Sequence, residues 1–510
     1  MSEWLQLSVS EPIRNALAEI GFNTPTPIQS EVLPVALTKK LDVFGAAETG
    51  SGKTLAFLIP IIETLIEDFG TESTENGEQK KKAKRRRVSA VILAPTRELV
   101  LQIHVEFKRI AQFTPFRSVA IIGGMSEEKQ ERLLGKKPHV IVATPGRFWS
   151  LVQRNDYASD FSRLRQVVID EIDRMVEKGH FKEVENILEA IHANTLPKLQ
   201  TLVFSATLTF IVLPNPGRAQ KTREEKLREI SKATRMRKNY RLVDVTNEFT
   251  TPTTLTERRM CCSSLLQKDS CLYFTLLSYP ARTLVFTNSI DAAQRLHGLL
   301  IKLQIRPTPL ILHAKMHEKK RLKNLERFSQ IPNSILLATD VAARGLDIQG
   351  IENVIHYQIP RTAEDYVHRS GRTARASRNG MSIMILDPKD VTRYRKICKN
   401  LKRTDDLPTL DSDNSRRMAA IEKRVHLASE LERLEYQMRK VTNRKSWEVR
   451  MAKEADIMLS DEEDSDPESE MSNKRRLKKS AERALKAALT QPLPASTLSF
   501  VGPAIKRDVI

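Results

Sequence analysis

The chain has 510 residues, and its 83 Lys and Arg outnumber 63 Asp and Glu, which gives a formal net charge of +20 at pH 7. At about 100–200 residues per domain, this length allows two or three domains. The four cysteines are too few for a disulfide scaffold and lack zinc-ligand spacing, and no apolar run approaches the ~18–20 residues that span a bilayer. We therefore expect a soluble intracellular protein in a reducing compartment, without a membrane partner and with a positive field suited to a polyanion.

The first half of the chain alternates short β-branched runs with helical stretches, which is typical of a parallel sheet covered by helices. The runs are almost continuously apolar, as expected for strands that are buried on both faces. The predicted strands are residues 41–47, 89–95, 118–124, 139–145, 166–170 and 201–207.

Two basic segments interrupt this first half. Residues 80–87 read KKKAKRRR within a polar stretch at about 71–88, which we interpret as an exposed basic loop. A nuclear-import signal is the favoured role of this loop, and a mere contribution to solubility is the alternative. The second basic segment, about 214–241, is predicted to be an inserted helix.

A second series of predicted strands follows, at residues 282–288, 308–314, 334–340, 353–360 and 381–386. The fold class is therefore α/β, with two consecutive domains. The predicted boundaries are an N-terminal domain at 1–245, a linker at 246–254, a second domain at 255–400 and an extension at 401–510.

The predicted extension begins as a helix and ends as a charged tail. Its apolar residues recur at spacings of three and four, which describes an amphipathic helix that packs on its own domain. The residues of this stripe are Met418, Ile421, Val425, Ala428, Leu431, Leu434 and Met438. The acidic tract at 460–470 and the basic run KRRLKK at 474–479 are expected to be disordered, because such blocks repel themselves.

Residues 47–54 read AETGSGKT, directly after a predicted strand and before an apolar helical run. They nearly match the phosphate-binding pattern G-x-x-x-x-G-K-[ST], with Ala47 in the first glycine position. The backbone N–H groups around Gly50 and Gly52 are expected to converge on phosphate oxygens. Lys53 is expected to reach the β- and γ-phosphates, and the Thr54 hydroxyl to face Mg²⁺.

The sequence Asp-Glu-Ile-Asp at 170–173 closes another apolar strand. Mg²⁺ prefers oxygen ligands, so Asp170 is the predicted partner of Thr54 at the metal. Glu171 is placed to orient or deprotonate an attacking water. Together with the phosphate loop, these carboxylates predict a nucleoside triphosphatase.

The segment HRSGRTAR at 368–375 supplies Arg369, Arg372 and Arg375 from the second predicted domain. Arginines stabilise the charge that develops as the γ-phosphoryl group departs. An enzyme with this arrangement turns over only when its two domains close. Hydrolysis is therefore coupled to the binding of a ligand in the cleft between the domains. The alternative is a solvated basic helix.

With these motifs in order, residues 4–400 resemble the DEAD-box ATP-dependent RNA helicases. GFNTPTPIQ (21–29), with Trp4 upstream, resembles the Q motif, AETGSGKT motif I and DEID motif II. Ser205-Ala206-Thr207 resembles motif III. PTRELV (95–100), Gly123-Gly124 and TPGR (144–147) resemble strand-gripping motifs, and LVFTN (284–288), ATDVAARGLDI (338–348) and HRSGRTAR resemble motifs IV, V and VI.

The resemblance implies two tandem RecA-like domains that use ATP and Mg²⁺. The implied ATP contacts are Phe22 and Gln29 at the adenine, Ala47, Glu48, Thr49, Gly50, Ser51, Gly52, Lys53 and Thr54 at the phosphates, Asp347 at the ribose, Gly345 elsewhere in the nucleotide site, and Arg372 and Arg375 as arginine fingers. The implied RNA contacts are Pro95, Thr96, Arg97, Gly124, Thr144, Arg147, Arg321 and Thr339. The residues implied to couple the two sites are Asp173, Ser205, Thr207 and His368.

Two positions depart from the family pattern. Glu48 stands where glutamine is common and adds a negative charge to the phosphate loop, which favours weaker nucleotide binding. Ile172 replaces alanine in motif II, but the three carboxylates keep their positions, and we expect activity to survive.

The resulting prediction is an ATP-dependent RNA helicase that binds the RNA backbone and locally unwinds short duplexes or remodels RNA–protein complexes. An ATP-gated RNA clamp or scaffold is the alternative, and a DNA helicase is a third class. The basic blocks, the acidic serine-rich tract and VEKGHF (176–181) resemble nucleolar members that assist large ribosomal subunit assembly. We therefore expect a monomer in the nucleus and nucleolus that works on pre-ribosomal RNA with proteins of the pre-ribosomal particle.

Overall fold

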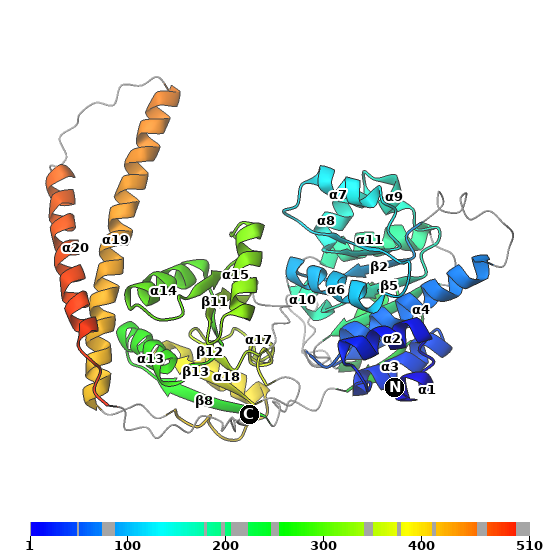
Figure 1. The fold of residues 1–510 in the computed structure, drawn as a ribbon, viewed down its shortest axis with the longest axis horizontal. Helices are drawn as coiled ribbons and strands as arrows, with labels where there is room; N and C mark the ends of the chain where they lie inside the picture. Colours follow the sequence, from blue (N-terminus) through cyan, green and yellow to red (C-terminus); the bar gives the residue numbers. More distant parts are fainter. Residues whose placement is uncertain are drawn as a thin grey trace. The chain divides into compact units, whose positions relative to one another are not determined.

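The computed structural model describes residues 2–47, 50–73, 87–177, 181–194, 199–205, 223–245, 254–340, 350–374, 379–410, 415–455 and 467–495. The chain divides into two compact units (Figure 1). We call the described residues up to Val245 unit 1 and those from Thr254 onward unit 2.

Unit 1 is built on a parallel sheet in the order β3-β4-β2-β5-β6-β1-β7. The strands are β1 (Val43–Ala46), β2 (Ala90–Leu93), β3 (Ser118–Ile121), β4 (Val140–Ala143), β5 (Gln166–Ile169), β6 (Gln200–Ser205) and β7 (Arg241–Asp244). The strands β1–β5 fall within the first five predicted apolar runs, and β6 begins one residue before the sixth run, 201–207.

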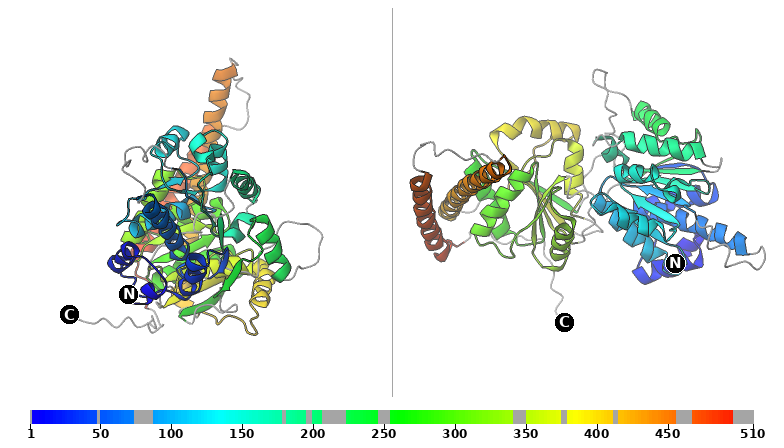
Figure 2. Two further views of the ribbon diagram at one scale, coloured as in Figure 1. Left: turned by 90° about the vertical axis from the view of Figure 1, so that its right-hand side faces the viewer. Right: turned by 90° about the horizontal axis from the view of Figure 1, so that it is seen from above.

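Helices cover both faces of this sheet, as Figure 2 shows, because neighbouring residues of each strand point to opposite faces. Val43 packs into a core under the N-terminal helices, while Phe44 packs into the core on the other face. The first core lies under α1 (Ser2–Gln6), α2 (Glu11–Ile20), α3 (Pro27–Leu33), the π-helix η1 (Pro34–Thr38), α4 (Lys53–Ser73) and α6 (Arg97–Ile110). The second lies under α7 (Glu127–Leu134), α8 (Pro145–Val152), α9 (Asp156–Ser159), α10 (Ile172–Glu177), α11 (Phe181–Asn194) and α12 (Arg223–Ala233).

Unit 2 contains a second parallel sheet, in the order β10-β11-β9-β12-β13-β8. The strands are β8 (Leu255–Cys261), β9 (Thr283–Thr287), β10 (Leu310–Leu312), β11 (Ile335–Thr339), β12 (Asn353–His356) and β13 (Gly380–Leu386). The helices around it are α13 (Leu265–Ser278), α14 (Ile290–Lys302), α15 (Glu318–Gln330), α17 (Ala363–Ser370), the 3₁₀-helix η3 (Pro388–Asp390) and α18 (Val391–Asn400). The prediction of two α/β units with parallel sheets flanked by helices is confirmed.

Two strands were missed by the sequence analysis, and both are edge strands. β7 lies at the end of the segment that we expected to be an inserted helix, of which only 223–233 is helical among the described residues. β8 reads LTERRMC and is only partly buried. An edge strand has a partner on one side only and tolerates polar residues, so neither strand shows the apolar run that marked the others.

The C-terminal extension forms two long helices, α19 (Ser415–Ala455) and α20 (Pro467–Thr490), which lie side by side in Figure 1. The predicted amphipathic stripe of α19 packs against α13 and α14, which confirms that it belongs to unit 2. The prediction of disorder was wrong for residues 474–479, which are part of α20. That helix is held because Ala481 and Leu485 enter the same core as α19.

None of the described helices combines the length and the hydrophobicity that crossing a bilayer requires.

Candidate active site

Three strands of unit 1 bring the predicted nucleotide motifs to one edge of the sheet. β5, β6 and β1 are neighbours, with Ile169 opposite Val203 and Ala46 opposite Ser205. The Ala47 backbone N–H donates to the Ser205 carbonyl oxygen over 3.2 Å. Because the carboxyl ends of parallel strands meet at one edge, the phosphate loop, the DEID segment and Ser205 lie together there.

The phosphate loop leads directly into α4, whose first residue is Lys53. Gly50 and Gly52 have φ values of +87° and +96°, a backbone conformation that favours glycine. The Lys53 side chain is 9% exposed, and its ammonium group donates to the Ala47 carbonyl oxygen of the same loop. This hydrogen bond joins Ala47 to Lys53, which stands at the N-terminus of a helix, where anions bind favourably.

Gln29 fixes the start of α3 against this loop. Its amide oxygen accepts from the Thr26 backbone N–H at 2.8 Å, and its amide nitrogen donates to the Gly52 carbonyl oxygen at 3.0 Å. The side chain is only 2% exposed. The structure thus shows Gln29 bridging α3 and the phosphate loop. Phe22 is 41% exposed, and the Trp4 indole N–H donates to its carbonyl oxygen at 3.0 Å.

The DEID segment concentrates negative charge in a buried place. Asp170 is 3% exposed, and burial together with the neighbouring Glu171 charge raises the pKa of its carboxyl group to about 7. The Lys53 charge acts in the opposite direction, and Asp173, which is also buried, adds to the repulsion. A cation beside Asp170 would relieve this cost, because it favours the charged carboxylate.

Glu171 has φ +51°, a left-handed conformation that is uncommon outside glycine. Its backbone N–H donates to Asp170 Oδ1 at 2.9 Å, which turns the chain sharply between β5 and α10. The Glu171 Oε2 atom is buried and has no hydrogen-bond partner among the described residues. Strained backbone and an unsatisfied carboxylate are features of sites that bind or react.

The residues at this edge fit a magnesium ion that also uses nucleotide and water oxygens. No group of three or more His, Cys, Asp or Glu among the described residues forms a complete metal site. Mg²⁺ commonly takes one or two protein carboxylates and completes its shell with phosphates and water. Asp170 and Thr54, at the ends of β5 and the phosphate loop, supply such oxygens.

The other half of the same edge carries the predicted RNA motifs, after β2, β3 and β4. Thr96 caps α6, where its hydroxyl accepts from the Leu99 N–H at 3.3 Å, and Thr144 stands at the start of α8. Pro95 is buried beside Thr96. Gly124 has φ +91°, and a Cβ atom built on it would lie 2.4 Å from Arg97 Nη1. Only a glycine admits the Arg97 guanidinium so close to the chain.

Arg147 has a protein partner that the sequence analysis missed. Its guanidinium donates to Glu127 at 2.6 Å, and Arg154 donates to the other oxygen of the same carboxylate at 3.3 Å. Glu127 lies 20 residues away in the sequence, at the start of α7, and no spacing rule connects the two positions. A phosphate at Arg147 would compete with this carboxylate.

In unit 2, Arg369 is part of the framework. Its guanidinium binds both carboxylate oxygens of Asp340 and donates to Gln358 O and Asn288 Oδ1, both at 2.7 Å. It also lies over the Phe286 ring. These contacts tie α17 to the ends of β9, β11 and β12, so Arg369 is fully engaged within unit 2. Asp340 and Asn288 were not among the predicted site residues.

The other predicted residues of unit 2 are buried around α17 and α15. Arg372 follows α17, and its Nε atom donates to the His368 carbonyl oxygen at 3.1 Å. Thr339 ends β11, and Arg321 lies in α15. The predicted site residues Glu48, Thr49, Thr207, Gly345, Asp347 and Arg375 lie outside the described residues.

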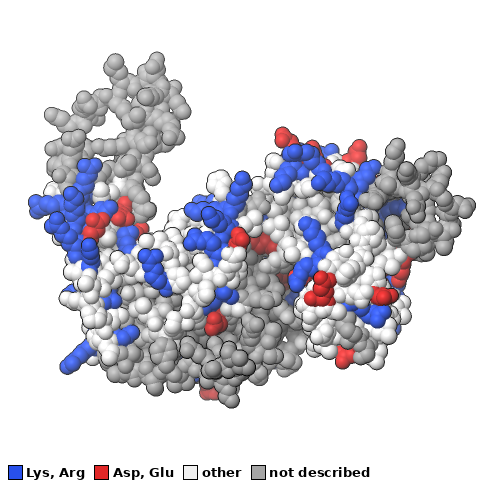
Figure 3. All heavy atoms as spheres, viewed as in Figure 1, with Lys and Arg blue, Asp and Glu red and all other residues white. Residues whose placement is uncertain are grey.

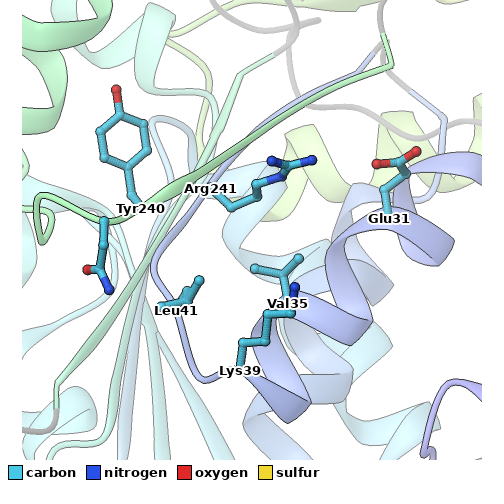
Figure 4. Close-up of a pocket in the computed structure, with 7 residues that line it drawn as sticks. Glu31, Val35, Lys39, Leu41, Tyr240 and Arg241 are labelled. Atoms are coloured by element: carbon cyan, nitrogen blue, oxygen red, sulfur yellow. The ribbon is translucent and has the colours of Figure 1, made fainter.

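A cavity of about 390 Å³ in unit 1 does not coincide with this edge (Figure 4). Leu41 and Arg241, two of its lining residues, lie at the amino ends of β1 and β7, whereas the phosphate loop follows the carboxyl end of β1. None of the predicted site residues lines it. The lining residues are Glu31, Val35, Lys39, Leu41, Asn239, Tyr240 and Arg241.

Comparison with known proteins agrees with this arrangement. Residues 26–213 match the family model described as DEAD/DEAH box helicase, and residues 267–377 match the helicase conserved C-terminal domain. The chain is 35% identical over 613 aligned positions to the "ATP-dependent RNA helicase DDX24" of Mus musculus, covering 97% of this chain and 71% of that protein. It is 36% identical over 471 positions to the "ATP-dependent RNA helicase mak5" of Schizosaccharomyces pombe, covering 91% and 70% respectively.

A solved structure of Mss116p bound to single-stranded RNA and AMP-PNP has the same fold, with a TM-score of 0.69 at 22% identity over 96% of this chain and 92% of that chain. The order of the motifs, the strand topology and these relatives lead to the same assignment. The chain belongs to the DEAD/DEAH box family and is an ATP-dependent RNA helicase.

Proposed function

We propose that unit 1 binds ATP at the β5-β6-β1 half of its edge and RNA at the β3-β4-β2 half. The observation that carries this proposal is the strand order, which separates the two sets of motifs into adjacent halves. The halves meet where the Asp170 backbone N–H donates to the Leu93 carbonyl oxygen at 2.9 Å. Leu93 ends β2, two residues before the RNA motif that begins at Pro95, so a shift of Asp170 acts directly on the RNA half.

Each group at the ATP half has a chemical task in this proposal. The N–H groups around Gly50 and Gly52 and the Lys53 ammonium group hold the phosphates, and Thr54 with Asp170 holds Mg²⁺. Bound magnesium neutralises charge that develops on the transferred phosphoryl group. Glu171, whose Oε2 atom has no hydrogen-bond partner among the described residues, orients the attacking water.

Unit 2 completes the reaction in this proposal. Arg372 and Arg375 stabilise the departing phosphoryl charge, Asp347 contacts the ribose, and Gly345 is part of the nucleotide-binding set. The coupling residues Asp173, Ser205, Thr207 and His368 relay the state of the nucleotide to the RNA. The RNA residues contact phosphate and sugar and therefore hold the strand without reading its sequence.

We also propose the RNA substrate, the cellular compartment and the domain boundaries of this protein. The basic run at 80–87, the acidic tract at 460–470 and VEKGHF at 176–181 support work on pre-ribosomal RNA, in the nucleus and nucleolus, with pre-ribosomal proteins as partners. Domain boundaries at 1–245, 246–254, 255–400 and 401–510 fit this scheme, with a monomer as the active form. Crosslinking the protein to cellular RNA and mapping the bound sites tests the substrate.

The enzymatic proposal is tested by RNA-stimulated ATP hydrolysis and unwinding of a short RNA duplex. Glu171→Gln is expected to lower turnover by about 10²–10⁴-fold, the range of a general base, while RNA binding in the presence of ATP persists. Glu106→Gln is the matched control, because Glu106 pairs only with Arg109 on the surface of α6 among the described residues.

Unchanged turnover of Glu171→Gln would remove the role given to this residue. Stimulation of the wild-type ATPase by single-stranded DNA to the same degree as by RNA would contradict the preference for RNA.

A further inference from the structure

The helix α20 has two chemically different faces. On one face, Ala481 and Leu485 are buried in the core of unit 2, and the Lys478 ammonium group pairs with Glu435 of α19 at 3.0 Å. On the other face the side chains are exposed and mostly basic. One face is thus used for attachment, and the other is available for a partner.

The exposed basic side chains form a continuous stripe, which we call the α20 stripe. At about 100° per residue, its five members fall within about 100° of arc and extend over about 16 Å of helix. None of them has a side-chain hydrogen bond or an ion pair with another described residue, and Figure 3 shows Lys and Arg gathered over α20, at the left of the view. The members are Arg475, Arg476, Lys479, Arg483 and Lys486.

Acidic neighbours of the stripe are engaged elsewhere. Glu435 and Glu432 of α19 pair with Lys302 of α14, and Glu435 also pairs with Lys478. Glu482 is the one acidic side chain within the described part of α20 from Asn473 onward, and it lies 3.6 Å from Lys478. From Asn473 onward, the described part of α20 therefore has a clear excess of basic over acidic side chains, with Glu482 at the flank of the stripe.

The C-terminal end of α20 is fastened to α19. Arg424 donates to the Ala488 carbonyl oxygen at 3.1 Å and to the Gln491 carbonyl oxygen, and Arg417 donates to the Pro494 carbonyl oxygen at 2.7 Å. These guanidinium groups cap carbonyl groups at and beyond the end of the helix, which favours the helical state. The stripe is thus presented by a helix that is already folded, so binding does not have to supply the ordering free energy.

We infer that the α20 stripe is a second RNA-binding surface, which holds the phosphate backbone of RNA independently of ATP. Guanidinium and ammonium groups without internal partners are the groups that bind phosphate oxygens, and guanidinium does so in a bidentate manner. The stripe offers no aromatic side chain for base stacking, so it binds without reading sequence. The inference rests on the RNA-directed function proposed above and adds a tether outside the helicase motifs.

The test measures binding of a fluorescein-labelled RNA hairpin to the full chain without nucleotide, by anisotropy, between 50 and 200 mM salt. In one variant all five members of the stripe are changed to Gln. Each phosphate contact contributes ~0.7–0.9 to the slope of log K against log salt concentration, so this variant should lose about 3.5–4.5 units of slope. Over this salt range, the wild-type affinity should fall about 100-fold to 500-fold more than that of the variant.

A matched control removes the same charge from exposed positions around α18, where the five basic side chains spread over about 160° of arc instead of about 100°. It changes Lys389, Arg393, Arg395, Lys396 and Lys399 to Gln. A second variant replaces Arg475, Arg476 and Arg483 by Lys, which keeps the charge and should keep the slope. Far-ultraviolet circular dichroism verifies that the helices persist in each variant.

The inference is overturned if the Gln variant of the stripe retains the wild-type slope, or if the α18 control loses as much slope. The former result would also be expected if the stripe bound an acidic protein. The proposed function fails separately, when RNA does not stimulate the wild-type ATPase, and that measurement does not depend on the salt slope.

Discussion

Gly52→Ala should disable the phosphate loop by two independent effects. At φ +96°, a residue with a side chain pays about 1–2 kcal/mol of backbone strain. The added Cβ would lie 2.5 Å from Gln29 Nε2 and 2.7 Å from Thr26 Oγ1, so both side chains must shift, which disturbs the hydrogen bond from Gln29 to Gly52 at a cost of about 1 kcal/mol. If the loop must regain its conformation to bind phosphate, the total of about 2–3 kcal/mol corresponds to a loss of about 30-fold to 140-fold in nucleotide affinity.

Two glycines provide controls for this prediction. Gly21 has φ +88°, and a Cβ atom there would meet no atom within 4 Å, so Gly21→Ala pays the backbone cost alone. Gly135 has a negative φ and only ordinary contacts around a new Cβ, so Gly135→Ala should be neutral.

The assay is titration with a fluorescent ATP analogue in the absence of RNA, together with the melting temperature of each variant. Gly21→Ala should lower the melting temperature while leaving nucleotide affinity within about threefold of the wild type. If Gly52→Ala bound the nucleotide as tightly as Gly21→Ala does, the contact between Gln29 and the loop would have no part in shaping the site.

Three further outcomes follow from buried groups. Asp170→Asn should raise the melting temperature of the nucleotide-free protein by a few degrees, because it removes a buried charge that neighbouring carboxylates repel. The same substitution should abolish ATP hydrolysis. A lower melting temperature would contradict the stability prediction. Burial and the Lys108 charge lower the pKa of His104, which contacts Ser118, to about 4, so the folded state prefers the neutral ring. Its contribution to stability is complete above pH 6.5 and falls by at most about 3 kcal/mol as the pH drops to 4, because solvent screens the partly exposed ring; His104→Gln should flatten this part of the pH profile of unfolding. Leu485→Ala should lower the protection of α20 in hydrogen exchange by about 2–5 kcal/mol, whereas Leu477→Ala, at a 56% exposed position of the same helix, should not change it.

The sequence predicted the buried strands of both sheets well, because a strand covered on two faces must be apolar along its whole length. Residues 89–95 and 166–170 were identified in this way, and β2 and β5 lie within them. The edge strands β7 and β8 were missed, since exposure on one side lets charged residues such as Arg241 and Glu257 occupy them. Exposure on one side also explains the wrong prediction of disorder at 474–479. These charged residues belong to a helix that is folded because its other face, with Ala481 and Leu485, is buried.

Local patterns in the sequence were enough to identify which residues can carry the chemistry and the order in which they occur, because a phosphate loop and a carboxylate pair each lie within a few consecutive residues. Only the folded chain shows that β1, β6 and β5 are neighbours. It also shows that β2, which leads into the RNA motif at Pro95, lies between these strands and the RNA motifs that follow β3 and β4. It also decided that Arg147 pairs with Glu127 and that Arg369 is bound to Asp340. Strand order and ion pairs depend on which distant segments pack together, and no spacing along the chain specifies them.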